Sequence, residues 1–333
     1  MQSAVQSETG GRCDRALDVS PLLPGSDLPL LVTPAGGQRW PATAAAMIAA
    51  ANAHLERAGG LLFRGFGLHG EAAFQQFARS FGHELLTYEF GSTPRSALGK
   101  GVYTSTEYPA HQVIPLHGEQ SYTRQWPMKI WFHCVQASEE GGETPIADSR
   151  LIYARLDPAL RRHVEKKRLM YTRNYGNGLD LPWQDAFNTD DRAVAERYCR
   201  DQQIEFEWKA DGELRTRQVC QAVARHPRTG EDVWFNQAHL FHVSNLAPAV
   251  RDALMLLVDD ERDLPRNVYY GDGTPIEASV LDEIRGVLDD CTVMFPWQQG
   301  DVLMLDNMLA AHGRATFKGA RKIIVAMAEA GHE

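Results

Sequence analysis

Three residues in two short segments have the types and spacing of a metal site. His117 and Glu119 are separated by Gly118. In an extended strand, side chains two residues apart point to the same face, so this imidazole and carboxylate can bind one ion while the glycine leaves room. His312, which follows a strand-like run, offers a third ligand. Two histidines and one carboxylate leave three coordination positions open on iron(II), enough for a bidentate 2-oxo acid and dioxygen.

The second chemical signal is an arginine downstream of His312. A His-x-Glu match is weak by itself, because a chain with 12 histidines and 43 acidic residues produces such matches by chance. Arg321, however, stands at the head of a strand-like run, where its guanidinium can hold the far carboxylate of 2-oxoglutarate in a bidentate fork. Thr144 can add a hydroxyl donor to the same carboxylate. The alternatives are a surface ion pair for Arg321 and an ordinary strand position for Thr144.

Five further residues are candidates for substrate contacts. They are polar or aromatic, and they lie in loops or strands near the metal motif or in a later strand: Arg95, Tyr122, Arg124, Trp234 and Asn236. Arg95 can pair with a substrate carboxylate or be a solvated loop charge. Tyr122 and Arg124 follow Glu119 closely, which places them near the mouth of a pocket. Trp234 and Asn236 share one strand face and can line the pocket, although a core Trp beside a hydrogen-bonded Asn is the favoured interpretation.

Other histidines compete weakly for the metal. His239 and His242 are three residues apart, which suits one face of a helix, but no carboxylate stands beside them at ligand spacing. His111 is interpreted as a loop residue. The His-Glu-x-x-His pattern of zinc hydrolases is absent from the sequence.

The elements that must position these residues change in character along the chain. The first thirty or so residues look irregular because Pro21, Pro24 and Pro29 interrupt any periodicity. The pattern then predicts helices at Thr43–Arg57, which Gly59 would cap, and at Ala72–Phe81, with a short buried strand at Leu61–Phe63 between them.

From about residue 100 onward, short strand-like runs dominate. The clearest are Val113–Leu116, Ile130–Val135, Leu169–Tyr175, Val233–Asn236, Thr292–Phe295 and Lys322–Met327. Helical patterns interrupt them at Pro158–Lys167, where Asp157 can be the N-cap, at Ala247–Val258 and at Ile276–Leu288. Many strands with inserted helices favour a β-barrel or jelly roll, and no G-x-G-x-x-G follows a strand, which argues against a Rossmann fold.

Composition sets the outer limits. The 333 residues include 44% hydrophobic and 23% charged residues, which is ordinary for a globular enzyme, and no linker divides the chain. We therefore expect one catalytic domain over residues 1–333, with an irregular segment at 1–30 and a helical or loop insertion at about 176–215. A formal charge of -9 argues against a nucleic-acid or membrane partner.

The five cysteines are odd in number and far apart, which favours free thiols in a reducing compartment: Cys13, Cys134, Cys199, Cys220 and Cys291. No apolar run is long enough to span a bilayer, and the N-terminus lacks a signal-peptide core. We expect a soluble cytoplasmic protein.

Three stretches together resemble a known superfamily. These are Ile114–Tyr122, Gly141–Asp148 and Asp306–Phe317 with Arg321, and they are similar to the taurine dioxygenase/clavaminate synthase-like (TauD/TfdA) oxygenases over roughly residues 60–330. Within that superfamily the chain looks closest to the SyrP-like branch, which is associated with tailoring of amino acids, some of them bound to carrier proteins.

The resemblance implies a mainly β fold with inserted helices (α+β) around a double-stranded β-helix, or jelly-roll, core. It also implies that His117, Glu119 and His312 bind iron(II), that Thr144 and Arg321 bind 2-oxoglutarate, and that dioxygen is consumed as 2-oxoglutarate is decarboxylated to succinate.

Two departures from taurine dioxygenase bear on the substrate. The carboxylate ligand is Glu119 instead of aspartate, and Val325 stands where taurine dioxygenase has a second arginine. Both argue against a sulfonate substrate. Halogenases of the superfamily lose the carboxylate, so the presence of Glu119 favours hydroxylation, desaturation or cyclisation.

The sequence leaves four functional hypotheses. The first two are oxidation of a free amino acid in specialised metabolism and the same reaction on an amino acid tethered to a peptidyl carrier protein. A carrier is itself acidic, so the charge of -9 disfavours docking unless a basic run at residues 161–168 gathers on one face. The others are a zinc hydrolase, which lacks its motif, and a non-catalytic jelly-roll protein, which predicts a damaged metal triad or a lost Arg321.

Overall fold

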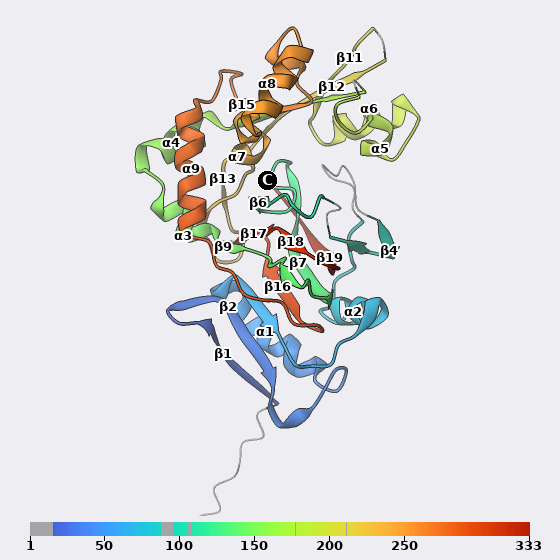
Figure 1. Cartoon of the computed structure of the whole chain (residues 1–333), viewed down its shortest axis with the longest axis vertical. Helices are drawn as coiled ribbons and strands as arrows, with labels where there is room; N and C mark the ends of the chain where they lie inside the picture. Colours follow the sequence, from blue (N-terminus) through green and yellow to red (C-terminus); the bar gives the residue numbers. More distant parts are fainter. Residues whose placement is uncertain (1–15, 88–95, 106–107, 177, 211) are drawn as a thin grey trace, which may run out of the picture.

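The computed structural model describes residues 16–87, 96–105, 108–176, 178–210 and 212–333. At its centre is an eight-stranded sheet with the strand order β1-β2-β3-β16-β7-β19-β5-β4 (Figure 1). The strands are β1 (Leu17–Leu23), β2 (Ser26–Pro34), β3 (Gly60–Phe63), β4 (Ala97–Gly99), β5 (Val102–Thr104), β7 (Gln125–Gln136), β16 (Val302–Asp306) and β19 (Lys322–His332). All neighbours pair antiparallel except β2 and β3, which are parallel.

A smaller sheet faces the large one and carries the metal-ligand candidates. It consists of β6 (Ile114–His117), β17 (Ala310–Arg314) and β9 (Ile146–Asp148), and a two-stranded ribbon, β8 (Glu140–Gly141) with β18 (Phe317–Lys318), lies outside it. Ile146 and Ala310 of this sheet share one buried cluster with Phe132, Leu303 and Ile323 of the large sheet. The two sheets therefore enclose a common core, as the predicted jelly roll requires.

Alternation along the central strands explains why the large sheet is covered on both faces. Leu303 and Leu305 point into the jelly-roll core, whereas Val302 and Met304 pack on the opposite side. Successive residues of a strand face opposite sides of the sheet. A strand made only of apolar residues is therefore buried on both faces. The cover on that opposite side is formed by α1 (Ala44–Ala58) and α2 (Gly70–Arg79).

A second layer, drawn at the top of Figure 1, lies on the metal-site side of the jelly roll. Its core is a four-stranded sheet in the order β11-β12-β10-β15, and a hairpin and several helices surround this sheet. The strands are β10 (Leu169–Tyr175), β11 (Glu205–Trp208), β12 (Leu214–Cys220), β13 (Val223–Arg225), β14 (Asp232–Trp234) and β15 (Arg266–Tyr270). The helices from α3 onward are α3 (Ser149–Arg155), α4 (Pro158–Lys167), α5 (Trp183–Phe187), α6 (Arg192–Asp201), α7 (Ala238–Phe241), α8 (Pro248–Leu257) and α9 (Ala278–Asp290).

Most elements expected from the sequence are confirmed. Gly59 caps α1 in the left-handed conformation, with φ of 78°, and the Asp157 side chain caps α4. The strand expected at Val233–Asn236 is β14, which pairs with β13 as an antiparallel hairpin. The cysteines that the structure describes, residues 134, 199, 220 and 291, are free and buried.

Three expectations are corrected. Residues 17–34 form the hairpin β1–β2 instead of an irregular segment, because Pro24 lies in the turn and Pro21 lies on an edge strand, where a missing N–H is tolerated. Thr292–Phe295 is not a strand, since only Val293 forms a bridge, to Ile146. The insertion at 176–215 contains α5 and α6 as expected, but also β11 and the start of β12.

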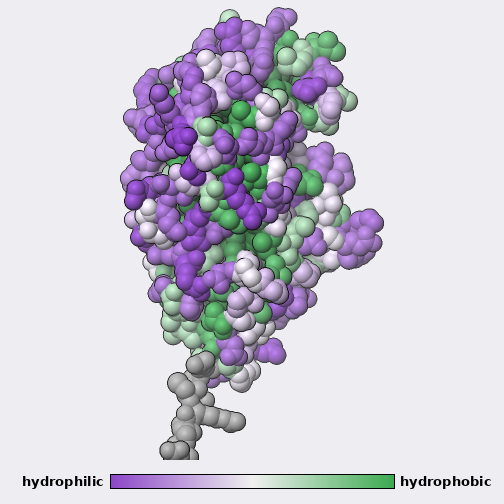
Figure 2. Space-filling view, turned by 90° about the vertical axis from the view of Figure 1, so that its left-hand side faces the viewer, coloured by the Kyte–Doolittle hydropathy of each residue, from purple (hydrophilic) through white to green (hydrophobic). Residues whose placement is uncertain are grey.

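One face of the molecule is largely hydrophilic. Figure 2 shows a face on which hydrophilic residues predominate and apolar residues form separate patches. Within the described residues, no helix is long and apolar enough to cross a membrane.

Candidate active site

Two of the three predicted metal ligands lie on neighbouring strands, and Glu119 lies in the turn that follows the first of them. His117 at the end of β6 and His312 in β17 are direct cross-strand partners, and their ring centroids are 4.6 Å apart. Glu119 Oε2 lies 3.8 Å from His312 Nε2. One ligand atom from each of the three residues fits within 4.8 Å of the others, and Glu119 and His312 are buried. Two strands thus bring together residues that are almost 200 positions apart in the sequence.

The tautomer of His117 suits a metal ligand. Its Nδ1 lies 2.8 Å from the backbone oxygen of Pro115. Because a carbonyl oxygen only accepts hydrogen bonds, Nδ1 carries the hydrogen and Nε2 presents its lone pair. With two imidazoles and one carboxylate in this arrangement, the donor set fits iron(II), and these three residues would hold it.

Buried amides hold the turn that carries Glu119. Asn307 Oδ1 accepts a hydrogen bond from the Glu119 backbone N–H at 2.7 Å. Asn307 Nδ2 donates to the backbone carbonyl oxygens of Glu119 and Pro127, at 2.9 and 2.8 Å. Gln237 Nε2 donates to the Gly118 oxygen at 2.8 Å. Gly118 is required here, because a Cβ at that position would lie 2.7 Å from the Phe235 ring.

The rival histidines do not join the triad. His239 Nε2 lies 2.8 Å from the backbone oxygen of Leu116, so the ring forms a hydrogen bond with β6. Burial lowers the pKa of His239 to about 4. His242 Nδ1 bonds to Ser244, although the residue lines the larger cavity described below. The sequence analysis likewise favoured neither histidine as a metal ligand.

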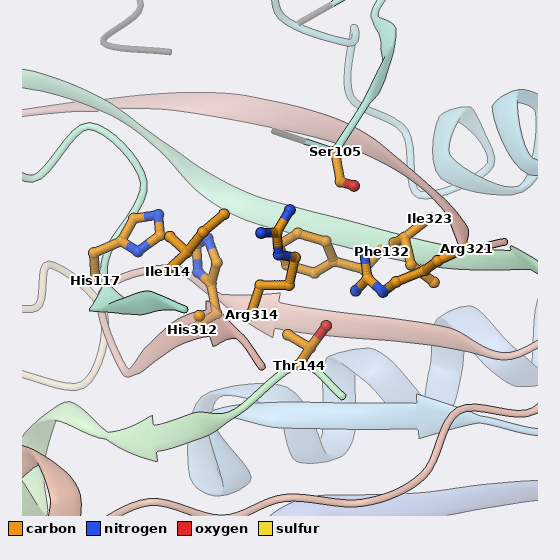
Figure 3. A pocket seen from close by; sticks show the side chains of 10 residues that line it. Ser105, Ile114, His117, Phe132, Thr144, His312, Arg314, Arg321 and Ile323 are labelled. Atoms are coloured by element: carbon orange, nitrogen blue, oxygen red, sulfur yellow. The ribbon is translucent and has the colours of Figure 1, made fainter. Parts of the chain in front are cut away.

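A small cavity extends from the two histidines to Arg321 (Figure 3). It is lined by Ser105, Ile114, His117, Phe132, Thr144, His312, Gly313, Arg314, Arg321 and Ile323. The predicted co-substrate residues therefore share one cavity with two of the metal ligands. Its free volume is about 30 Å³, so side chains of its wall would need to move apart for a dicarboxylate to enter.

The charges in this cavity suit an anion. Burial, together with the nearby charge of Arg314, lowers the pKa of Arg321 to about 10, so the guanidinium is protonated at neutral pH. Arg321 Nε donates to the Gly142 oxygen at 2.9 Å, and Arg314 is anchored by the carbonyls of Tyr108, Pro109 and Gln112. Two partly buried guanidinium groups side by side favour a ligand with two negative charges.

Thr144 is oriented by a residue that sequence analysis did not single out. Trp297 Nε1 donates to Thr144 Oγ1 at 3.2 Å, and both side chains are buried. Because the hydroxyl oxygen accepts from the indole, its own hydrogen is left for an acceptor such as a carboxylate.

A much larger cavity of about 900 Å³ lies on the other side of His117. His117 and Ile114 line both cavities, and Glu119 and Tyr122 line the larger one. The rest of its wall comes mainly from residues 179–181, 237–254 and 264–266 of the upper layer. A ligand there would lie beside the metal ligands, opposite the arginine pair.

The residues predicted to contact the substrate lie in different surroundings. Tyr122 lines the larger cavity. Arg124 does not line it; its side chain pairs with Glu333 at 2.9 Å instead. Trp234 belongs to a buried apolar cluster, and Asn236 bonds to backbone groups of Ala222 and Ala238, which fits the core interpretation of both. Arg95 lies outside the described residues.

Comparisons with known proteins agree with this geometry. Residues 27–327 match the family model described as "Taurine catabolism dioxygenase TauD, TfdA family". The dapdiamide synthesis protein DdaC of Enterobacter agglomerans is 43% identical over 273 residues, which cover 82% of this chain and 83% of DdaC. A clavaminate synthase-like protein of Arabidopsis thaliana is 31% identical over 284 residues, 82% of each chain.

Solved structures share the fold at low identity. PvcB, an Fe, alpha-ketoglutarate-dependent oxygenase from an isonitrile synthetic pathway, superposes with a TM-score of 0.52 at 19% identity, covering 98% of this chain and 94% of PvcB. AAD-2 in complex with Mn(II) and N-oxalylglycine gives a TM-score of 0.53 at 14% identity, covering 95% of this chain and 98% of AAD-2.

The metal triad and Arg321 are both present, whereas a non-catalytic jelly-roll protein was expected to have lost one of them. The chain belongs to the TauD/TfdA family of iron(II)- and 2-oxoglutarate-dependent dioxygenases.

Proposed function

We propose that this dioxygenase hydroxylates an unactivated C–H bond of an amino acid, free or tethered to a carrier protein, in specialised-metabolite biosynthesis. The observation that carries the proposal is the position of His117 between two cavities, one with paired arginines and one large enough for a substrate of amino-acid size or more. The similarity to a dapdiamide synthesis protein supports a role in natural-product assembly. The proposal includes membership of the SyrP-like branch, which the sequence motifs suggested.

Each cavity has a separate task in this proposal. When bound, iron would activate dioxygen, which is the oxidant for C–H cleavage, and 2-oxoglutarate would supply two of the electrons as it is decarboxylated to succinate. Arg321 and Thr144 orient the dicarboxylate, and the larger cavity holds the substrate carbon beside His117 and Glu119. Misplacement of that carbon by about 1 Å would cost on the order of a hundredfold in rate, so the shape of the larger cavity decides the product. Desaturation or cyclisation of a small carboxylate substrate is the alternative outcome at the same site.

A carrier protein is the less supported source of the substrate. The basic run that would have to face an acidic carrier is largely engaged within the chain. Lys167 pairs with Asp272, Arg168 bonds to Glu333 at 2.7 Å, and Arg161 donates to the Tyr153 oxygen at 2.7 Å.

A succinate-release assay tests the proposal. The iron-loaded protein is given 2-oxoglutarate with a panel of amino acids, free and carrier-loaded, and His312→Ala serves as the inactive control. We expect succinate formation above the substrate-free rate with a subset of amino acids, and a product that has gained one oxygen atom. Loss of two hydrogens would identify desaturation or ring closure instead. A panel that never raises succinate formation would reject the amino-acid proposal.

A further inference from the structure

Two arginines and one aspartate form a charged trio at the wall of the larger cavity, which Asp180 and Arg266 line. Arg173 in β10 and Arg266 in β15 are direct cross-strand partners. Like charges that face each other across a sheet destabilise it, so this placement needs a compensating group. Asp180 supplies it, with a side chain that is 7% exposed.

Asp180 holds Arg266 in one orientation. Arg266 Nε and Nη2 donate to Asp180 Oδ2 and Oδ1, both at 2.6 Å, which is the bidentate geometry that fixes a guanidinium plane. Arg173 Nη2 is 3.8 Å from Asp180 Oδ2. Burial would lower the pKa of Arg266, but the hydrogen bonds and charge of Asp180 raise it on balance, so the group stays cationic.

The trio carries one positive charge in excess, since one carboxylate faces two guanidinium groups. Arg173 is 3% exposed and Arg266 is 30% exposed, so a partner anion can reach the excess charge through Arg266. Arg266 and Asp180 line the same cavity as His117 and Glu119. The cavity thus has metal ligands in one part of its wall and a preoriented cation in another.

We propose that Arg266 binds a carboxylate of the substrate, with Asp180 holding its guanidinium in place and Arg173 supplying the excess charge. This deepens the proposed function and rests on it: the substrate would be an amino acid with a free carboxylate. A phosphate, such as that of a phosphopantetheine arm, offers the same chemistry. The titrations below distinguish a carboxylate from a phosphate.

Binding measurements on the protein without added metal test the assignment independently of catalysis. L-amino acids, the corresponding L-amino acid amides and 4′-phosphopantetheine are titrated by calorimetry into the wild type and Arg266→Gln. We expect at least one amino acid to bind the wild type tenfold or more tightly than its amide does. Arg266→Gln should abolish that preference.

Arg215→Gln is the matched control. Arg215 lies in β12, on the other side of β10 from β15, and pairs with Asp263. It does not line the cavity, so this variant should keep the preference for the acid over the amide. Equal binding of acid and amide, no binding by any amino acid, an Arg266→Gln protein that keeps the preference, or tighter binding of 4′-phosphopantetheine would each overturn the assignment. Preserved binding without succinate formation would instead reject the proposed reaction and leave the carboxylate site standing.

Discussion

The two cavities that meet at His117 are built from different kinds of structure. The small one is framed by strands: β6, β7, β17 and β19 contribute Ile114, Phe132, His312 and Ile323. The large one is framed mostly by the loops and short helices of the upper layer, between residues 179 and 266. Strands held by backbone pairing fix the position of their side chains, whereas loops vary more freely in length and sequence.

This difference separates the two halves of the reaction. Metal and co-substrate need fixed geometry, and their proposed site is where cross-strand pairing imposes it, as between His312 and His117. The proposed substrate site is where changes of loop and helix can reshape the wall without moving the ligands. The two cavities should therefore respond independently to substitution.

The largest expected effect is at the shared metal site. His312→Ala removes one of the three ligands, and we expect it to abolish specific binding of Fe(II) or Mn(II), measured by calorimetry. His163→Ala, on the exposed face of α4, is the control and should bind metal as the wild type does. Unchanged metal affinity in His312→Ala would mean that the ligand assignment is wrong.

Arg321→Met should act on the small cavity alone. Loss of a buried charged partner is worth about 3 kcal/mol, so the KM for 2-oxoglutarate should rise on the order of a hundredfold, while the KM for the substrate stays within error. The neighbouring Lys322→Met removes only a surface ion pair with Glu71 and should change neither value. If Arg321→Met leaves the KM for 2-oxoglutarate intact, this arginine does not anchor the co-substrate.

Asn307→Ala tests whether the framework behind the small cavity tunes the metal. The variant leaves the Glu119 peptide without its partners, so metal affinity should fall roughly 10- to 100-fold. Asn174→Ala is the matched control: this asparagine is also fully buried and bonds to the backbone oxygens of Arg262 and Leu264, far in sequence from the ligands. Both variants should lose stability in thermal melts, but only Asn307→Ala should lose metal affinity.

The smallest expected effect belongs to the large cavity. Leu254→Ala removes an apolar side chain from its wall, a loss of about 1 kcal/mol of apolar contact, so the KM for the substrate should rise about fivefold. The KM for 2-oxoglutarate should not change. Leu256→Ala, on the same helix but 88% exposed, should alter neither constant. A shift in both constants with Leu254→Ala would contradict the independence of the two cavities.

The contrast between the small and the large cavity also explains which site residues could be predicted from the sequence. His117 and Glu119 could be predicted because residues two apart in an extended segment share a face. His312, Thr144 and Arg321 were predicted from their place in motifs that resemble those of a known superfamily. Asn307 and Trp297 were missed as positioning residues, because their partners lie far away in the sequence and only the fold shows which groups they reach.

The large cavity was largely hidden for the same reason. Asp180 and Arg266 are 86 residues apart and meet only through the pairing of β10 with β15. Arg124 was expected beside the pocket because it is near Glu119 in the sequence, yet the chain turns after the ligand and pairs Arg124 with Glu333. The β1–β2 hairpin was missed because prolines at an edge strand and in a turn interrupt the periodicity by which a strand is recognised.

A crystal structure of the protein with Mn(II) and 2-oxoglutarate tests the central claim most directly. The account predicts an anomalous manganese peak bound by His117 Nε2, Glu119 and His312, with 2-oxoglutarate extending from it toward Thr144 and Arg321 in the small cavity. Manganese at any other site, or 2-oxoglutarate in the large cavity, would contradict it.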